Sequence, residues 1–237
     1  MTLVNERRLA QHYTELYGQV LCEDFVIDKT GAKLVEIINF SVELDPTQKF
    51  LEFPGRKTPV KYVDDELKWY DSMDLSVDFI GQKAQIWKDV SSSEGKINSN
   101  YGWMIYSPDN YSQYSHCLEE LQHNRESRRA VMIYQRPSMQ VDYNYKGMSD
   151  FCCTDGVQCF IRKNKLTYIV KMRSNDGIFG FFNDFAWHAT VYERLFKDLK
   201  ETYPDLEYGS LFWNAASFHV YERHFPMLKQ MVTGESQ

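Results

Sequence analysis

Residues 148–160 read MSDFCCTDGVQCF and place two adjacent cysteines, Cys152 and Cys153, directly before a run that is typical of a β-strand. A cysteine in front of a strand is in most proteins a small core residue. The same residue type is also a nucleophile, because its thiolate attacks electron-poor carbon. The sequence on either side of this stretch is needed to choose between the two roles.

The neighbouring segments predict a sheet flanked by helices. A β-hairpin is expected from Val157–Ile161 and Leu166–Met172, which flank the turn Lys163-Asn164-Lys165. Further strands are predicted at Leu34–Phe40, Ala130–Tyr134 and Ser210–Val220. Helices are predicted at residues 4–17, 64–73 (with Asp64 or Asp65 as the N-cap), 111–123, 185–203 and 222–231, and loops at 45–61 and 91–100. This alternation indicates an α/β (α+β) fold with one large mixed β-sheet, in a single domain that spans residues 1–237.

The composition excludes several classes of function. A formal charge of −6 gives no reason to expect direct nucleic-acid binding. Five cysteines, an odd number with two adjacent, indicate a reduced, cytoplasmic setting. The chain has no CxxC or HExxH pattern, so no metal site is expected. It has no apolar run of ~18 residues, and its first residues are charged, so neither a membrane span nor a signal peptide is expected.

Short segments spread along the chain share an order and spacing with one known family. They are DKTG at 28–31, DELKWY at 65–70, NSNYGW at 98–103, SRR at 127–129, RPSMQ at 136–140, SDFCCT at 149–154, MRSND at 172–176, FND at 182–184 and FHVYERH at 218–224. From about Phe25 to Leu228 the sequence resembles the thymidylate synthase superfamily, and within it the bacteriophage deoxycytidylate hydroxymethylases. The resemblance implies a thymidylate synthase-like fold and a homodimer that associates through the sheet face.

The resemblance also implies covalent catalysis on a pyrimidine. C5 of the base is too weak a nucleophile to attack a one-carbon donor until a thiolate has added at C6. In the family the nucleophile precedes a glutamine by five residues, a pairing that Cys153 and Gln158 reproduce. We therefore assign Cys153 as the nucleophile, leave Cys152 as a packing residue, and place Gln158 among the substrate-binding residues. Arg173 resembles the arginine that supplies a positive field to the thiol.

The substrate phosphate is expected to meet several donors. Arg173 and Ser174 come from MRSND, and Lys29 stands in DKTG where the synthases usually have arginine. Arg128 and Arg129 resemble the pair that reaches across from the partner subunit, although adjacent arginines are more often a solvated charge pair. If the resemblance holds, each active site is shared and the enzyme is an obligate homodimer.

Base choice is expected at Asp184. Uracil-specific synthases carry asparagine here, whose amide matches O4 and N3–H. Cytosine presents the reverse, an amino donor at C4 and an acceptor at N3, which a carboxyl matches. The competing interpretation of Asp184 is a helix N-cap. Glu66 resembles the glutamate that organises water and proton transfer, although a glutamate on such a helix is usually at the surface.

The remaining site residues follow from the resemblance alone. His219 and Tyr221 resemble the pair that binds the sugar 3′-hydroxyl, although a histidine between Phe218 and Val220 is more often a core residue. Asp176 resembles the aspartate that meets the pterin ring. Trp87 and Tyr101 match positions that line the folate and base site.

The function implied is transfer of a one-carbon unit from 5,10-methylenetetrahydrofolate to C5 of dCMP, with water capture giving 5-hydroxymethyl-dCMP for modified phage DNA in the host cytoplasm. Reductive capture, giving 5-methyl-dCMP or dTMP, is an alternative, and an inactive nucleotide- or folate-binding relative is another. Hydride capture requires that water is excluded. The polar ending TGESQ at 233–237 is poorly suited to sealing a site, which favours hydroxymethylation.

Overall fold

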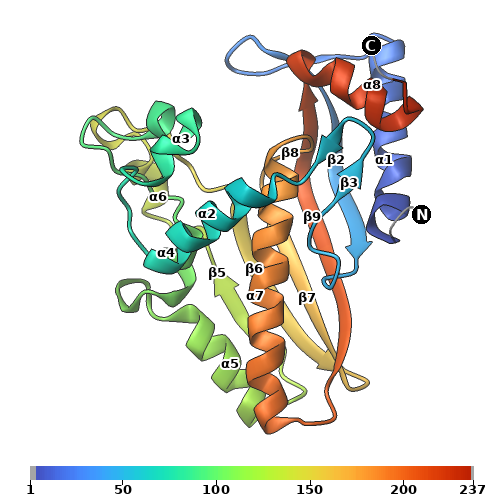
Figure 1. Cartoon of the computed structure of the whole chain (residues 1–237). Coiled ribbons are helices and arrows are strands. Elements are labelled where there is room, and N and C mark those ends of the chain that lie inside the picture. Colours follow the sequence, from blue (N-terminus) through green and yellow to red (C-terminus); the bar gives the residue numbers. More distant parts are fainter. Residues whose placement is uncertain (1–3, 236–237) are drawn as a thin grey trace.

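A twisted sheet of seven strands runs through the middle of the protein (Figure 1). The computed structural model describes residues 4–235. The strand order is β1-β2-β9-β7-β6-β5, and β8 also pairs with β9. Since β7 and β8 run parallel to β9 while the other pairs are antiparallel, the sheet is mixed, as predicted. The strands are β1 (Val26–Ile27), β2 (Lys33–Leu44), β5 (Val131–Ile133), β6 (Thr154–Arg162), β7 (Lys165–Met172), β8 (Asn175–Asp176) and β9 (Glu207–Tyr221), and a separate hairpin pairs β3 (Glu52–Phe53) with β4 (Arg56–Lys57).

The predicted hairpin directly after the two cysteines is confirmed. Strands β6 and β7 pair from Thr154 opposite Met172 to Arg162 opposite Lys165. The turn places Lys163 and Asn164 at φ 48° and 65°, and positive φ at both central residues suits the twist of a tight hairpin. Alternate residues of both strands face the core, namely Val157, Cys159, Ile161, Leu166, Tyr168, Val170 and Met172.

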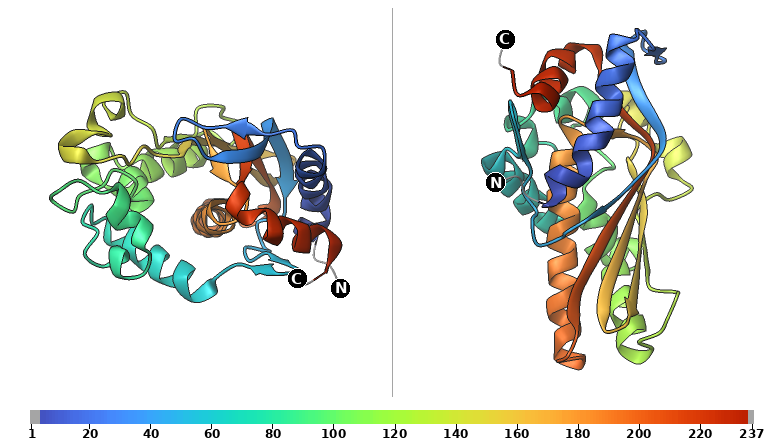
Figure 2. Two further views of the ribbon diagram at one scale, coloured as in Figure 1. Left: turned by 90° about the horizontal axis from the view of Figure 1, so that it is seen from above. Right: turned by 90° about the vertical axis from the view of Figure 1, so that its right-hand side faces the viewer.

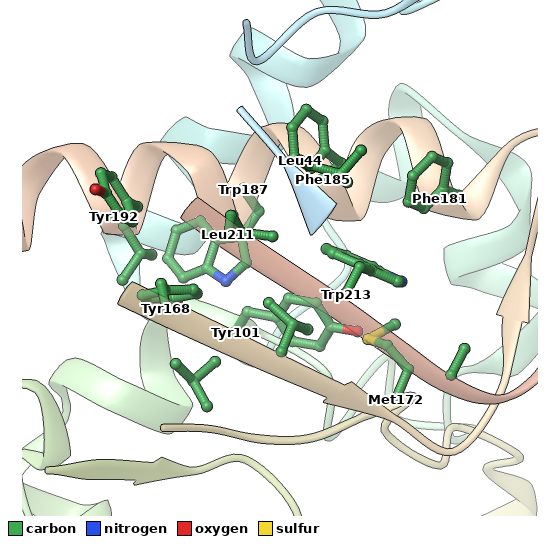
Figure 3. Close-up of a cluster of buried hydrophobic side chains, with 14 of the residues drawn as sticks. Leu44, Tyr101, Tyr168, Met172, Phe181, Phe185, Trp187, Tyr192, Leu211 and Trp213 are labelled. Carbon is green, nitrogen blue, oxygen red and sulfur yellow. The ribbon is translucent and has the colours of Figure 1, made fainter. Parts of the chain in front are cut away.

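Helix α7 (Gly180–Thr202) lies along the inner face of the sheet and carries much of the core (Figures 1 and 3). Phe181 packs edge-on against Trp213 of β9, with ring centroids 5.2 Å apart. Tyr192 meets Tyr168 of β7 at 5.9 Å in the same way. Because these rings are buried at the start and in the middle of the helix, α7 has a fixed position over β7 and β9. The other helices are α1 (Val4–Leu21), α2 (Val60–Ser72), α3 (Gln85–Val90), α4 (Tyr101–Tyr106), α5 (Gln113–His123), α6 (Met139–Asp142) and α8 (Phe225–Thr233).

Four helix starts differ from the prediction. Helix α8 begins at Phe225 and not at residue 222, because a separate 3₁₀ turn spans Glu222–His224. Helix α2 begins at Val60, directly after Pro59, and not at Asp64 or Asp65, because a proline suits the start of a helix. Helix α5 begins at Gln113 because the two residues before it are left-handed. Helix α7 begins at Gly180 rather than at residue 185, so Asp184 lies inside the helix and is not its N-cap. The predicted loop at 45–61 holds β3, β4 and the first residues of α2.

The face of the sheet opposite α7 retains exposed apolar side chains. Figure 2 shows, in its right-hand view, α7 on one side of the long strands. On β5 the residues that point away from the core, Val131 and Ile133, are 39% and 54% exposed. None of the helices within residues 4–235 is both long and apolar enough to cross a bilayer. Ser236 and Gln237, the last residues of the polar ending, lie outside the described residues.

Candidate active site

Cys153 lies beside Arg173 where β6 begins and β7 ends. The Nη2 atom of Arg173 is 3.7 Å from the Sγ atom of Cys153. The guanidinium is held in place because its Nε donates to the carbonyl of Cys152 at 2.8 Å and its Nη2 to that of Phe151 at 2.6 Å. The backbone N–H of Arg173 also donates to the carbonyl of Cys153 at 2.9 Å. The predicted pairing of this thiol with this arginine is therefore present.

The two cysteines have different surroundings. Cys152 is fully buried, and its thiol donates to the carbonyl of Thr154 at 3.1 Å. Cys153 is partly exposed. Burial raises the pKa of the Cys153 thiol to about 11, while Arg173 lowers it and nearby carboxylates raise it. The arginine therefore acts in the expected direction, but burial outweighs it in the free protein, because a thiolate is costly to remove from water.

Asp184 projects from the first turns of α7 toward the same site. The Nδ2 atom of Asn175 donates to its Oδ2 at 2.9 Å. Burial raises the pKa of Asp184 to about 7, the hydrogen bond from Asn175 lowers it, the charge of Asp176 raises it and Tyr101 lowers it. The charge of Asp184 also raises the pKa of Cys153. A carboxyl with this pKa exchanges its proton near neutrality.

Glu66 lies on α2 and is only 5% exposed, so it is not a surface residue. Tyr62, one turn earlier, donates to its Oε1 at 2.8 Å, and Trp87 donates to the Tyr62 hydroxyl at 2.9 Å. Burial raises the pKa of Glu66 to about 8, against the hydrogen bond from Tyr62, and the charge of Asp184 raises it further. Glu66 is therefore a second carboxyl group whose pKa is raised toward neutrality.

Three further predicted site residues lie around the end of β9, namely Asp176, His219 and Tyr221. Asp176 on β8 pairs in register with His219, and its Oδ1 accepts the backbone N–H of Ile178 at 2.9 Å. His219 is 6% exposed, and burial lowers its pKa against the charge of Asp176. Burial raises the pKa of Tyr221, and the charges of Asp28 and, more weakly, Cys153 add to this. The DKTG turn, with Asp28 beside Lys29, thus borders the same region.

Lys29 itself is exposed, and Ser174 is partly buried between Arg173 and Asn175. An open hollow of about 510 Å³ adjoins the site through Tyr62. It is lined by Pro59, Val60, Lys61, Tyr62, Asp65, Gln82 and Lys83.

Three predicted site residues lie away from the thiol within one chain. Gln158 is five residues along an extended strand from Cys153, roughly 16 Å, and its amide donates to the carbonyl of Arg128 at 2.9 Å. Arg128 and Arg129 are exposed on the loop before β5. Arg129 pairs with Glu120 of α5 at 3.0 Å. These residues form a separate group near β5 and β6.

The structure also shows contributors that the sequence did not reveal. The buried carboxylate of Asp150 accepts the backbone N–H groups of Asn98 and Ser99, each at 2.7 Å, and so connects the cysteine segment to the start of α4. Asn175 donates a hydrogen bond to Asp184, and Tyr62 donates one to Glu66. The spacing of Tyr62 four residues before Glu66 was a usable signal for a helical pair. The contacts of Asp150 and Asn175 join distant segments, so no local pattern predicts them.

The site combines a nucleophilic thiol with two carboxyl groups whose pKa values lie near neutrality, a set suited to covalent catalysis with proton transfer. Within residues 4–235, no group of His, Cys, Asp or Glu side chains is arranged to hold a metal ion.

Comparison with known proteins gives the family. The thymidylate synthase family model matches residues 11–237. A deoxycytidylate 5-hydroxymethyltransferase of Enterobacteria phage T6 is 50% identical over 218 residues, covering 90% of this chain and 87% of that protein. The protein of the same name from Enterobacteria phage T4 is 49% identical with the same 90% and 87% coverage. A thymidylate synthase of Francisella philomiragia is 22% identical over 219 residues, covering 88% of this chain and 78% of that protein. With a family match over nearly its whole length and relatives at half identity, this chain belongs to the thymidylate synthase family.

Proposed function

We propose that this protein transfers a one-carbon unit from 5,10-methylenetetrahydrofolate to C5 of dCMP and releases 5-hydroxymethyl-dCMP. The names of the relatives at 50% and 49% identity support this substrate and product. The observation that carries the proposal is a carboxyl, Asp184, at the position beside Cys153 where uracil-specific relatives are expected to have an amide. Because the relatives are phage proteins, we place the reaction in the cytoplasm of an infected host.

The residues around Asp184 suit a folate co-substrate. A Cβ atom on Gly180 would lie in ordinary contact with the Cβ of Asp176, at 3.5 Å, and with Oδ2 of Asp184, at 3.6 Å, so the glycine leaves unfilled only the space of a methyl group beside these two residues. The aromatic side chains of Tyr62 and Trp87 lie next to Glu66, since Tyr62 donates to Glu66 and Trp87 donates to Tyr62. Lys61 and Lys83 in the adjoining hollow are donors that suit the carboxylates of a folate. The co-substrate supplies the one-carbon unit, and we propose Trp87, Tyr101 and Asp176 as the residues that hold it.

In the proposed reaction Cys153 adds to C6 of the ring as a thiolate. Asp184 gives a proton to N3, so the ring becomes a neutral enamine whose C5 attacks the one-carbon unit. C5 then loses its proton and the bond between the transferred carbon and the folate nitrogen breaks, so tetrahydrofolate leaves and an exocyclic methylene remains on the base. A water oriented by Glu66 loses a proton and adds to this carbon. The C6–S bond then breaks, N3 returns its proton to Asp184, and the thiolate is regenerated.

We also propose how the nucleotide is held. Arg173, Ser174 and Lys29 would bind the phosphate, while His219 and Tyr221 would bind the sugar hydroxyl. Within one chain Arg128 and Arg129 lie apart from the thiol, and we propose that they complete the phosphate site of a partner subunit. Gln158 would hold their loop in place through its hydrogen bond to the carbonyl of Arg128. The exposed Val131 and Ile133 support a homodimer that associates through this face of the sheet.

Release of tritium from 5-³H-dCMP in the presence of methylenetetrahydrofolate tests the proposal. We expect release by the wild-type protein, and a loss of roughly 10³-fold or more in Cys153→Ala. Cys152→Ala is the matched control. It should keep its turnover and lose only about 1 kcal/mol of stability, because it removes one buried sulfur atom. Absence of release from the wild-type protein would refute the enzyme, and undiminished release from Cys153→Ala would refute the nucleophile.

A further inference from the structure

We propose that Asn175 is a positioning residue: with Trp213 it fixes Oδ2 of Asp184 as a hydrogen-bond acceptor and leaves Oδ1 as the atom of that carboxyl that exchanges a proton with the base. This inference rests on the proposed function, since it concerns how Asp184 reads cytosine. Asn175 lies on β8, next to the proposed phosphate-binding segment, and is 2% exposed.

The orientation of the Asn175 amide follows from its two partners. Its Oδ1 is 3.2 Å from Nε1 of Trp213, and its Nδ2 is 2.9 Å from Oδ2 of Asp184. An indole N–H only donates, so it must meet the amide oxygen, and the amide nitrogen must therefore face Asp184. Trp213 cannot move to suit another arrangement, because its side chain extends from β9 and is fully buried beneath α7 (Figure 3).

The amide in turn determines where a proton on Asp184 can sit. An amide N–H only donates, so Oδ2 must accept, and a proton placed on Oδ2 would face another donor in a buried site. The proton therefore belongs on Oδ1. The hydroxyl of Tyr101, which also acts on Asp184, imposes no such choice, because a hydroxyl both donates and accepts.

The fixed proton position matches cytosine and rejects uracil. With Oδ1 toward N3, the carboxyl donates to N3 and its Oδ2 accepts from the C4 amino group. Uracil carries a hydrogen on N3 and an oxygen at C4, so it requires the proton on Oδ2, where the Asn175 amide opposes it. The hydrogen bond from Asn175 therefore disfavours uracil, in addition to the hydrogen bonds by which Asp184 favours cytosine.

Other ionisable groups around Asp184 come from several elements. Asp176 of β8 raises its pKa, while Asp184 in turn acts on Glu66, Tyr62 and Tyr70 of α2, on Tyr101 of α4 and on Cys153. Asn175→Leu changes none of these groups and is close to isosteric. Its effect on Asp184 can therefore be read as the loss of the amide alone.

The first test is the titration of Asp184 followed by ¹³C NMR of its carboxyl in the free protein. The Asn175 hydrogen bond lowers the pKa of Asp184, so Asn175→Leu should raise it above its wild-type value of about 7. Trp213→Phe, which removes the donor that orients the amide together with part of a buried ring but leaves Asn175 in place, should raise it less. An unchanged pKa in Asn175→Leu would overturn the inference, whatever the wild-type protein does with dCMP. If Asn175→Leu does not fold, Trp213→Phe carries the same comparison.

The second test uses base preference in two backgrounds. In the wild-type background, Asn175→Leu should lower kcat/KM for dCMP by roughly 10-fold. In Asp184→Asn, the Asn175 amide should donate to the new side-chain oxygen at position 184 and hold it on the Oδ2 side. The new N–H₂ group at position 184 would then face N3–H of uracil, which is also a donor. Adding Asn175→Leu frees the side-chain amide at position 184 to turn and should raise kcat/KM for dUMP by a similar factor. A residue with a merely structural role would lower both activities, so a fall in dUMP turnover in the double variant would overturn the inference. A wild-type protein that is inactive on dCMP would instead refute the proposed function.

Discussion

In the proposed reaction, the choice between cytosine and uracil depends on Asp184. Its carboxyl lies inside α7, is held by Asn175 and has a pKa of about 7. It can therefore give a proton to N3 of cytosine at neutral pH, which an amide cannot do.

Replacing this carboxyl should change the preferred base. We expect Asp184→Asn to lower kcat/KM for dCMP by at least about 10²-fold, because the proton donor to N3 is lost, and to lower the dCMP:dUMP preference accordingly. Paired assays with dCMP and dUMP measure this ratio. Asp198→Asn, which removes a carboxylate that binds Tyr114 away from the site, is a suitable control. An unchanged preference in Asp184→Asn would show that another residue reads the base.

The raised pKa of Glu66 predicts a pH dependence of stability. Its pKa in the folded protein is about 8 against an ordinary 4.5, so the folded state holds this proton more tightly than the unfolded chain. The stabilisation is therefore fully present below about pH 4 and is lost as pH rises through 8. Glu66→Gln should match the wild type near pH 5 and exceed it near pH 8.5, on the order of 3 kcal/mol, or roughly 5–10 °C in Tm. The exposed Glu119→Gln is the control, and a Tm difference independent of pH would contradict the assignment.

At the scale of elements, Asp150 connects two segments that carry site residues. Its carboxylate accepts from the backbone of Asn98 and Ser99 and, at 2.6 Å, from the Ser99 hydroxyl. Asn98 and Ser99 lead into α4, which carries Tyr101, and Asp150 precedes Cys153 by three residues. We expect Asp150→Ala to lower stability by about 3 kcal/mol, since buried donors lose their acceptor.

Asp150→Ala should also reduce kcat, because the segments that carry Cys153 and Tyr101 lose the hydrogen bonds that connect them. Chemical denaturation and steady-state kinetics measure the two effects. Asp142→Ala, at the end of α6, where the carboxylate pairs with Arg136 and is 43% exposed, serves as the control. Full stability in Asp150→Ala would contradict this role.

The elements with a long repeating pattern could be predicted from the sequence, and those without one could not. Strands β6 and β7 follow alternation with a hairpin turn, and α7 follows helical spacing over many residues. Helices α3 and α4 have six residues each, which is too short for a period to show. The start of α7 was missed because the aromatic run from Phe179 to Phe182 shows no polar face.

In the proposed homodimer, a second copy of the chain completes the site. Arg173 lies at the thiol, whereas Arg128 and Arg129 lie beside the exposed sheet face. The family resemblance identified these residues, since their spacing alone says nothing about which subunit they serve. The hydrogen bonds made by Asn175 and Asp150 could not be predicted from the sequence, because they depend on how distant segments meet in the fold.

Mixing two inactive variants tests whether the site is shared. We expect the double variant Arg128→Ala/Arg129→Ala to be inactive on its own, as Cys153→Ala is. After unfolding and refolding together in equal amounts, half of the dimers should contain one intact site, giving about a quarter of the wild-type activity. The mixture of Cys153→Ala with itself is the control. No recovery in the mixed dimers would contradict the exchange of arginines between subunits.

The mass of the product formed from dCMP and 5,10-methylenetetrahydrofolate distinguishes water capture from hydride capture. We expect dCMP plus the elements CH₂O, the 5-hydroxymethyl nucleotide, with no dihydrofolate absorbance. A product heavier than dCMP by CH₂, formed together with dihydrofolate, would show that hydride and not water captures the intermediate, and would contradict this expectation.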